Sequence, residues 1–252
     1  MLDSLTPATV FLALVGGILP ALFWLWFWLQ EDNLHPEPRR LLLFAFLLGM
    51  AATALSYPLE MWADTHMPGF TPQKFLIWAI IEEGLKWLGI IFLITHTRFF
   101  DEPIDAVMYT VTGALGFAAL ENAMFLIAPL GTGDHLAALR IENFRFIGAT
   151  LLHVSASAIP GIVIATMFFH KKSPWFYGFL GLLGAIALHT AFNVSIMESA
   201  GNNIYMIFLT LWGVVLGILY CCEKIKRMHP TSEEVFPKFE IMLPPTTSHR
   251  SV

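Results

Sequence analysis

Charged residues are scarce in this sequence. Of its 252 residues, 13% are Asp, Glu, Lys or Arg, whereas an ordinary soluble domain carries roughly 25%. Apolar residues make up 56% of the chain, and the mean hydropathy is +0.66. This deficit of charge excludes a soluble globular domain and predicts a membrane protein surrounded by a lipid bilayer. The net charge of -5 gives no basis for binding nucleic acid.

Cysteine pairs and a basic N-terminal segment are also lacking. Cys221 and Cys222 are the two cysteines, and because they are adjacent they cannot form a disulfide framework. The first residues, Met1-Leu2-Asp3, carry no positive side chain, and the apolar run after them is longer than the core of a signal peptide. We therefore expect the first apolar run to be a retained transmembrane helix.

Apolar runs dominate what is present. About seven of them approach the roughly 20 residues needed to cross a bilayer. They lie at about 8–29, 41–59, 75–95, 104–128, 146–169, 175–197 and 203–222. Because lipid offers no partner for an open backbone, each should be a helix. The predicted fold class is all-α, with residues 1–222 forming one polytopic transmembrane bundle and residues 223–252 a polar, disordered cytoplasmic tail.

The distribution of Lys and Arg predicts the orientation of the bundle. The segments after the first, third, fifth and seventh runs hold Arg39, Arg40, Arg98, Lys171, Lys172, Lys224, Lys226 and Arg227. The segments after the second, fourth and sixth runs hold Lys74, Arg140 and Arg145. Since positive residues concentrate on the cytoplasmic side, we expect the N-terminus outside and the C-terminus in the cytoplasm.

A few ionisable side chains lie well inside the expected spans. They are Glu82, Glu83, Lys86, Glu121, His153 and His189, distributed over four helices. Each unpaired charge at mid-membrane costs roughly 2.5–3.5 kcal/mol, so such residues normally face the bundle interior and mark function. With the orientation above, the four helices bring these groups to one level, roughly 10–12 Å below the outer boundary. We therefore expect them to form one polar cluster.

Helical spacing suggests how the cluster is arranged. Glu82 and Lys86 are four residues apart and share a face, an order that favours an ion pair, whereas Glu83 points about 100° away. His189 and Asn193 are also four residues apart.

Structural explanations exist for each of these residues. The Glu82–Lys86 pair can simply neutralise itself, a single histidine can be a packing residue, and Asn122 and Asn193 can join helices. A shared depth is harder to explain by separate packing roles.

The same residues form a recognisable set of motifs. Glu82-Glu83-Gly-Leu-Lys86 fits EExxK, Phe117-Ala-Ala-Leu-Glu121-Asn122 fits FxxxEN, and His153 and His189 follow on later helices. Asp32 with Pro36-Glu37-Pro38 fits an early D…PEP element. This ordered set, from about Asp32 to Asn193, resembles the PrsW family of bacterial membrane proteases, which is related to the type II CAAX prenyl proteases and to bacteriocin-immunity membrane proteins.

The resemblance implies an activity and a partner. It implies hydrolysis of a peptide bond within the bacterial plasma membrane, with a single-pass membrane protein such as an anti-sigma factor as substrate. The CAAX branch carries His where this chain has Glu121, which favours PrsW, whereas His189-Thr-Ala-Phe-Asn193 matches the HxxxN element of that branch. HExxH and GxSG motifs of other membrane proteases are absent from the sequence.

Two mechanisms remain open at the level of sequence. In the favoured one no cofactor is used: Glu82 or Glu83 is the general base, His153 activates the water, His189 and Asn193 face the oxyanion, and Glu121 orients a histidine. In the alternative, Glu121, His153 and His189 bind Zn²⁺. A proton-coupled transporter or channel and a catalytically idle immunity-type protein are the non-enzyme alternatives.

Overall fold

The fold is all-α within the part of the chain that can be described. The computed structural model describes residues 6–32, 36–170, 173–199 and 202–228, and no β-strand occurs in them. The long helices are α1 (Pro7–Trp28), α2 (Arg39–His66), α3 (Pro72–His96), α4 (Pro103–Gly131), α5 (His135–Phe144), α6 (Thr150–Thr166), α7 (Pro174–Ser199) and α8 (Ile204–Lys226). A π-helical segment, Arg145–Ala149, joins α5 to α6, and short 3-10 turns follow α1 and α6.

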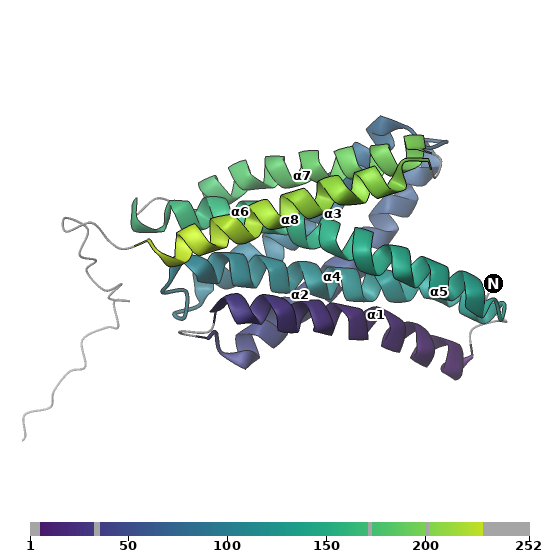
Figure 1. Ribbon diagram of the computed structural model, residues 1–252, viewed down its shortest axis with the longest axis horizontal. Helices are drawn as coiled ribbons and strands as arrows, with labels where there is room; N and C mark the ends of the chain where they lie inside the picture. Colours follow the sequence, from purple (N-terminus) through teal and green to yellow (C-terminus); the bar gives the residue numbers. More distant parts are fainter. Residues whose placement is uncertain (1–5, 33–35, 171–172, 200–201, 229–252) are drawn as a thin grey trace, which may run out of the picture.

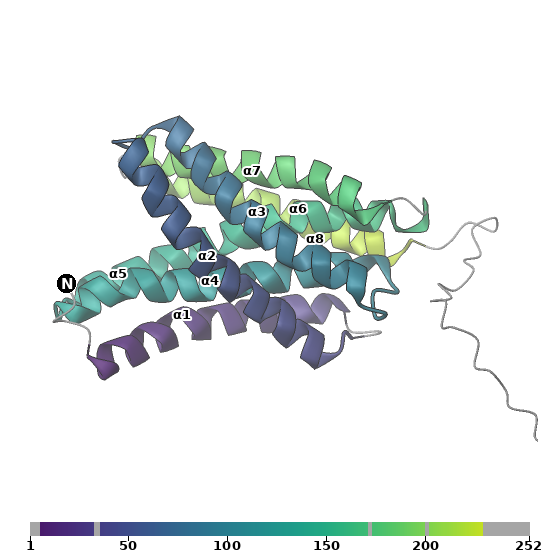
Figure 2. The same cartoon turned by 180° about the vertical axis from the view of Figure 1, so that it is seen from behind.

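Most of the helices run roughly along the long axis of the molecule (Figure 1), and α2 and α3 cross it obliquely (Figure 2). Among the described residues, six helical stretches are long and apolar enough to cross a membrane: α1, α2, α4, the continuous stretch from His135 to Thr166, α7 and α8. The remaining long helix, α3, lies beside them (Figure 2), but Glu82, Glu83 and Lys86 interrupt its apolar sequence. The predicted polytopic bundle is therefore confirmed, and the chain is a multi-pass membrane protein.

Several helices begin with the same local signal. Thr6 and Thr71 each accept a hydrogen bond from the backbone N–H three residues later, and a proline follows each of them at the first helical position. Proline suits that position because its missing N–H would have no partner there. At α4 the carboxylate of Asp105 accepts the N–H groups of Asp101 and Glu102, 3.0 and 2.7 Å away. These caps fix where the apolar runs become helices.

Two helices, α4 and α6, form the centre of the bundle. In α4, 67% of the most apolar 18-residue segment is buried, and in the stretch containing α6 the buried share is 72%. The corresponding share in α1, α7 and α8 is only 17–22%. Close approach depends on small residues: a Cβ on Gly49 of α2 would strike the carbonyl of Gly113, and one on Gly116 of α4 would strike that of Phe46. Thr53 of α2 also donates to the Phe117 carbonyl, 2.9 Å away. These contacts hold α4, up to the start of the FxxxEN segment, against α2.

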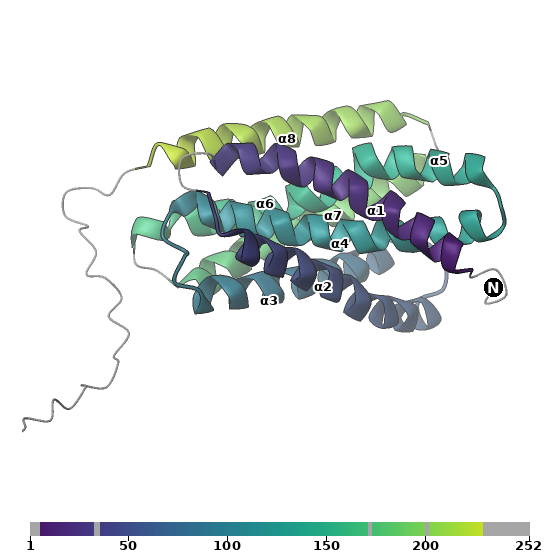
Figure 3. The same ribbon diagram turned by 90° about the horizontal axis from the view of Figure 1, so that it is seen from below.

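The structure corrects several details of the expected spans. The second span runs to His66, beyond the expected end at 59. The fifth span does not begin at residue 146, because the helix already starts at His135 and its axis continues through the π-helical segment (Figure 3). Arg140 and Arg145 are therefore helical residues, and Lys74 is a buried residue of α3 whose Nζ lies 3.1 Å from Asp64. The last helix reaches Lys226, beyond the expected end at 222, whereas most of the expected tail, 229–252, lies outside the described residues.

The orientation of the bundle stays a prediction that reporter fusions can test. The C-terminal end of α8 and the start of α2 are rich in Lys and Arg. Both lie on the side of the bundle opposite to the start of α1 (Figure 1). We expect a reporter that works only in the cytoplasm to be active at Val252 and at Asp101 and silent at Met1 and at Thr132. The reverse pattern would move the polar cluster to the cytoplasmic half of the membrane.

Candidate active site

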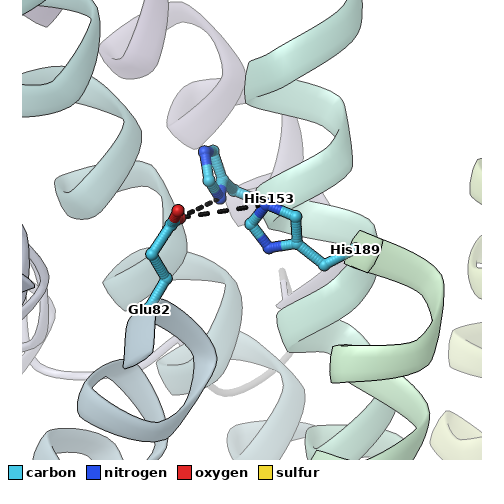
Figure 4. Close-up of side chains that lie close together, drawn as sticks. All are labelled: Glu82, His153 and His189. Atoms are coloured by element: carbon cyan, nitrogen blue, oxygen red, sulfur yellow. Dashed lines mark ion pairs between the residues drawn. The ribbon is translucent and has the colours of Figure 1, made fainter. Parts of the chain in front are cut away.

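Glu82 of α3 and two histidines converge in the interior of the bundle. Oε2 of Glu82 lies 3.9 Å from Nδ1 of His153 on α6 and 3.9 Å from Nε2 of His189 on α7. Figure 4 shows the carboxylate pointing at both imidazole rings. The three residues are between 2% and 5% exposed. This oxygen of Glu82 has no hydrogen-bond partner among the described residues, so it is a buried acceptor aimed at two ring nitrogens.

Each histidine ring contacts a second carboxylate through the nitrogen that faces away from Glu82. Nε2 of His153 lies 2.8 Å from Oε2 of Glu121, and Nδ1 of His189 lies 2.8 Å from Oε1 of Glu83. Because a carboxylate only accepts, the proton of each ring must sit on the nitrogen that faces it. The lone pairs of Nδ1 in His153 and Nε2 in His189 are then directed toward Glu82. The sequence-based hypothesis that Glu121 orients a histidine agrees with this geometry.

Lys86 pairs with Glu83, and the expected pairing with Glu82 is wrong. The Nζ of Lys86 lies 2.5 Å from Oε1 of Glu83 and 3.0 Å from Nδ1 of His153. It also stands 4.3 Å above the ring of Phe117. The physical reason is direction: Glu82 turns its carboxylate toward the histidines, which leaves Glu83, three residues before Lys86, as the nearer partner. Glu83 is saturated further by the hydroxyl of Ser157, which donates to Oε2 over 3.2 Å.

The FxxxEN segment contributes the other side of the cluster. Glu121 and Asn122 both receive hydrogen bonds from Arg145 in the π-helical segment. Asn122 in turn donates to the hydroxyl of Thr150, 3.0 Å away. Asn122 therefore joins α4 to α6 and does not face Glu82. The sequence analysis does not identify Arg145 as a site residue, because its place just before an expected span suggests a loop. Its position between Phe144 and Phe146 is the only feature of the sequence that indicates a buried arginine.

Asn193 and the early motif lie apart from this cluster. Asn193 is half-buried one turn after His189, and the described part of the structure shows no hydrogen bond between it and the cluster. Glu37 is buried near the start of α2, where the hydroxyl of Tyr109 donates to it. Tyr109 lies 12 residues before Glu121 on α4, roughly 18 Å along the helix. Glu37 thus helps to fix the opposite end of the bundle; the side chain of Asp32 lies outside the described residues.

The polar cluster lies at one level, as the sequence predicts. Glu82 lies ten residues after the start of α3, Glu121 ten before the end of α4, and His189 ten before the end of α7. These ends all belong to the side of the bundle where α1 begins, which puts the cluster roughly 15 Å from it along the helices. This is deeper than the expected depth of roughly 10–12 Å, because α3, α4 and α7 extend beyond their expected ends on this side.

The donor set fits a metal ion, with one change from the expected ligands. One atom each from Glu82, His153 and His189 lie within 4.8 Å of one another. In the zinc alternative drawn from the sequence Glu121 is the carboxylate ligand, but in the structure it faces the other nitrogen of His153. Two imidazoles and one carboxylate are a common ligand set of catalytic zinc, whose neighbouring ligand atoms lie roughly 3.3 Å apart. The unbonded oxygen of Glu82 and the carboxylates behind both histidines match the usual surroundings of such ligands.

Comparison with known proteins identifies relatives along most of the chain. A sequence model described as "PrsW family intramembrane metalloprotease" matches residues 37–220. "Protease PrsW" of Geobacillus kaustophilus is 27% identical over 82% of this chain and 90% of its own length. The Bacillus subtilis "Protease PrsW" is 28% identical over 81% of this chain and 94% of its own length, and that of Clostridioides difficile is 25% identical over 90% and 94%. No solved structure matches the chain.

Proposed function

Because this chain belongs to the PrsW family of intramembrane proteases, we propose that it hydrolyses a peptide bond of a membrane-anchored protein with a metal ion held by Glu82, His153 and His189. The observation that carries the metal is the unbonded Oε2 of Glu82, 3.9 Å from a ring nitrogen of each histidine. A bacterial plasma membrane is the proposed location, since the relatives above are bacterial proteins. The proposed substrate is a single-pass membrane protein, with an anti-sigma factor as the first candidate.

Each polar residue has a distinct role in this proposal. A bound zinc ion would activate water and polarise the scissile carbonyl. Glu121 and Glu83 hold His153 and His189 in the tautomers that leave a lone pair toward Glu82. Lys86, paired with Glu83, places its Nζ next to the same centre and can stabilise the negative charge that develops on the carbonyl oxygen. The buried surroundings exclude bulk water, which strengthens each of these interactions.

A glutamate mechanism without metal is the second candidate, and one observation favours it. The Nζ of Lys86 lies 3.0 Å from Nδ1 of His153 and occupies the lone pair that a metal would need. In this mechanism Glu82 takes a proton from the attacking water and passes it to the leaving amine. Both candidates use Glu82 as the central group and differ in whether Lys86 gives way to a metal ion.

Metal removal tests the choice between them. We expect the purified protein to contain one zinc per chain, and exhaustive chelation to abolish cleavage of a single-pass substrate until zinc is added back. The reason is that three protein ligands leave a fourth position for the reacting water. Elemental analysis of Glu82→Gln should show loss of the metal, whereas Glu198→Gln, at an exposed position of α7, should keep it. Full cleavage after chelation, with no stoichiometric zinc, would establish the glutamate mechanism instead.

A further inference from the structure

The π-helical segment changes what the helix between α5 and α6 presents to the bundle. The N–H of Thr150 donates to the carbonyl of Arg145, five residues earlier, where an α-helix would use the residue four earlier. Trp24 of α1 donates its indole N–H to the carbonyl of Phe146, 3.3 Å away. A π-helical turn contains an extra residue, so it rotates the side chains before it relative to those after it, and it occurs frequently at functional sites.

Arg145 is fixed on several sides at this turn. Its Nη2 donates to Oε2 of Glu121, and its Nε donates to Oδ1 of Asn122, 2.5 Å away. Its guanidinium carbon lies 4.0 Å from the centre of the Phe125 ring. The side chains of Arg145 and Glu121 are 14% and 21% exposed, so the pair is largely shielded from solvent. A planar guanidinium can make these contacts together, whereas a lysine ammonium has no comparable fork.

One oxygen connects this arginine to the histidine. Oε2 of Glu121 accepts from Arg145 and also lies 2.8 Å from Nε2 of His153. The arginine fixes the position of this oxygen, and the oxygen keeps the proton of His153 on Nε2. Nδ1 of His153 is then left as an acceptor on the side of Glu82, where the Nζ of Lys86 lies 3.0 Å from it. Without Arg145, Glu121 would lose its charged partner and be free to turn away from the ring.

We propose that Arg145 is a positioning residue that acts through Glu121 to hold His153 in the Nε2–H tautomer. The inference deepens the proposed function, on which it rests, because it explains how His153 is kept ready for a metal ion or a water molecule. Neither the sequence motifs nor the family match assigns a role to this arginine.

The tautomer of His153 gives a test that does not depend on cleavage. Histidine-labelled, metal-free protein in detergent is observed by ¹⁵N NMR, and the His153 signal is assigned by its absence from His153→Gln. Because Lys86 also lies 3.0 Å from Nδ1 of His153, Arg145→Gln is compared with its parent in a Lys86→Met background. We expect the parent to show Nε2–H alone and Arg145→Gln to show a mixture of both tautomers. Arg140→Gln is the matched control, because Arg140 is exposed on α5 and makes no ion pair with any residue that the structure describes. A folded Arg145→Gln with an unchanged tautomer would overturn the proposal.

Turnover provides a second readout of the same inference. We expect Arg145→Gln to lower kcat about 10- to 100-fold, the usual effect of losing a group behind a ligand, with little change in KM. In a Glu121→Gln background, Arg145→Gln should have little further effect on kcat, because the carboxylate through which Arg145 acts is already gone. An equal loss of kcat in both backgrounds would contradict a role of Arg145 that acts through Glu121.

Arg145→Lys serves if Arg145→Gln does not fold. This variant keeps the positive charge but lacks the planar guanidinium that can bind Glu121 and Asn122 together. A wild-type tautomer of His153 together with a wild-type kcat would overturn the proposal. If no variant or wild-type protein cleaves any substrate, the protease proposal fails, but the NMR result still decides the role of Arg145.

Discussion

Glu82→Gln is expected to lower turnover at least ~100-fold without lowering the stability of the metal-free protein. The loss of turnover follows whether the carboxylate is a metal ligand or a general base, since removing a base alone typically costs about 10²–10⁴-fold. In the metal-free protein stability should be unaffected or slightly improved, because Oε2 of Glu82 is then buried without a hydrogen-bond partner among the described residues and a neutral amide is cheaper to bury. Turnover is measured on a verified substrate and stability by unfolding in detergent.

Glu83→Gln is the informative comparison for this prediction. Glu83 forms an ion pair with Lys86 and hydrogen bonds with Ser157 and His189, so its replacement should lower stability as well as turnover. The loss of turnover should be smaller than in Glu82→Gln. The sequence left open which of the two adjacent glutamates is the central group, and the structure favours Glu82 by the direction of its side chain. Near wild-type turnover in both variants would remove the EExxK helix from the reaction altogether.

Lys86→Met is expected to lower the free energy of unfolding by about 3–5 kcal/mol, the usual cost of breaking a buried ion pair by removing one partner. The Nζ of Lys86 lies 2.5 Å from Glu83, and the two side chains are 3% and 2% exposed. The methionine would leave the Glu83 carboxylate buried without its cation. Reversible unfolding in detergent micelles measures the loss.

Two further variants separate the ion pair from general packing. Lys224→Met, at an exposed position near the end of α8, should change stability by no more than about 0.5 kcal/mol. The double variant Glu83→Gln with Lys86→Met should be more stable than Lys86→Met alone, because no uncompensated charge then remains. If Lys86→Met proved no more harmful than Lys224→Met, the buried pair would contribute nothing to the fold.

The sequence was sufficient to predict that the six ionisable side chains inside the spans assemble, because the energetic argument is local to each helix. A charge such as that of Lys86 cannot face lipid at low cost, so the helices that carry such groups must turn them inward. Counting residues along each helix then predicted a common level for Glu82, Glu121 and His189, which the structure confirms. Length and hydropathy likewise predicted a polytopic all-α bundle.

Pairing within the cluster depended on the rotation of each helix and the direction of each side chain, which spacing along one helix does not specify. Spacing suggested Lys86 with Glu82, but the histidines of two other helices draw Glu82 away and leave Lys86 to Glu83. Glu121, the carboxylate ligand of the zinc alternative, contacts Nε2 of His153 and not the side of the ring that faces Glu82, because α4 packs against that other edge of the ring.

The sequence by itself determined an all-α membrane bundle and the ionisable residues in its interior, because the cost of burying charge in lipid is fixed by residue type and depth. Only the tertiary structure decided that Glu82 faces the two histidines, that Asn193 lies apart, and that Arg145 reaches Glu121. The physical reason is that these contacts join different helices, and the last depends on an extra residue in a π-helical turn that no periodic pattern in the sequence indicates.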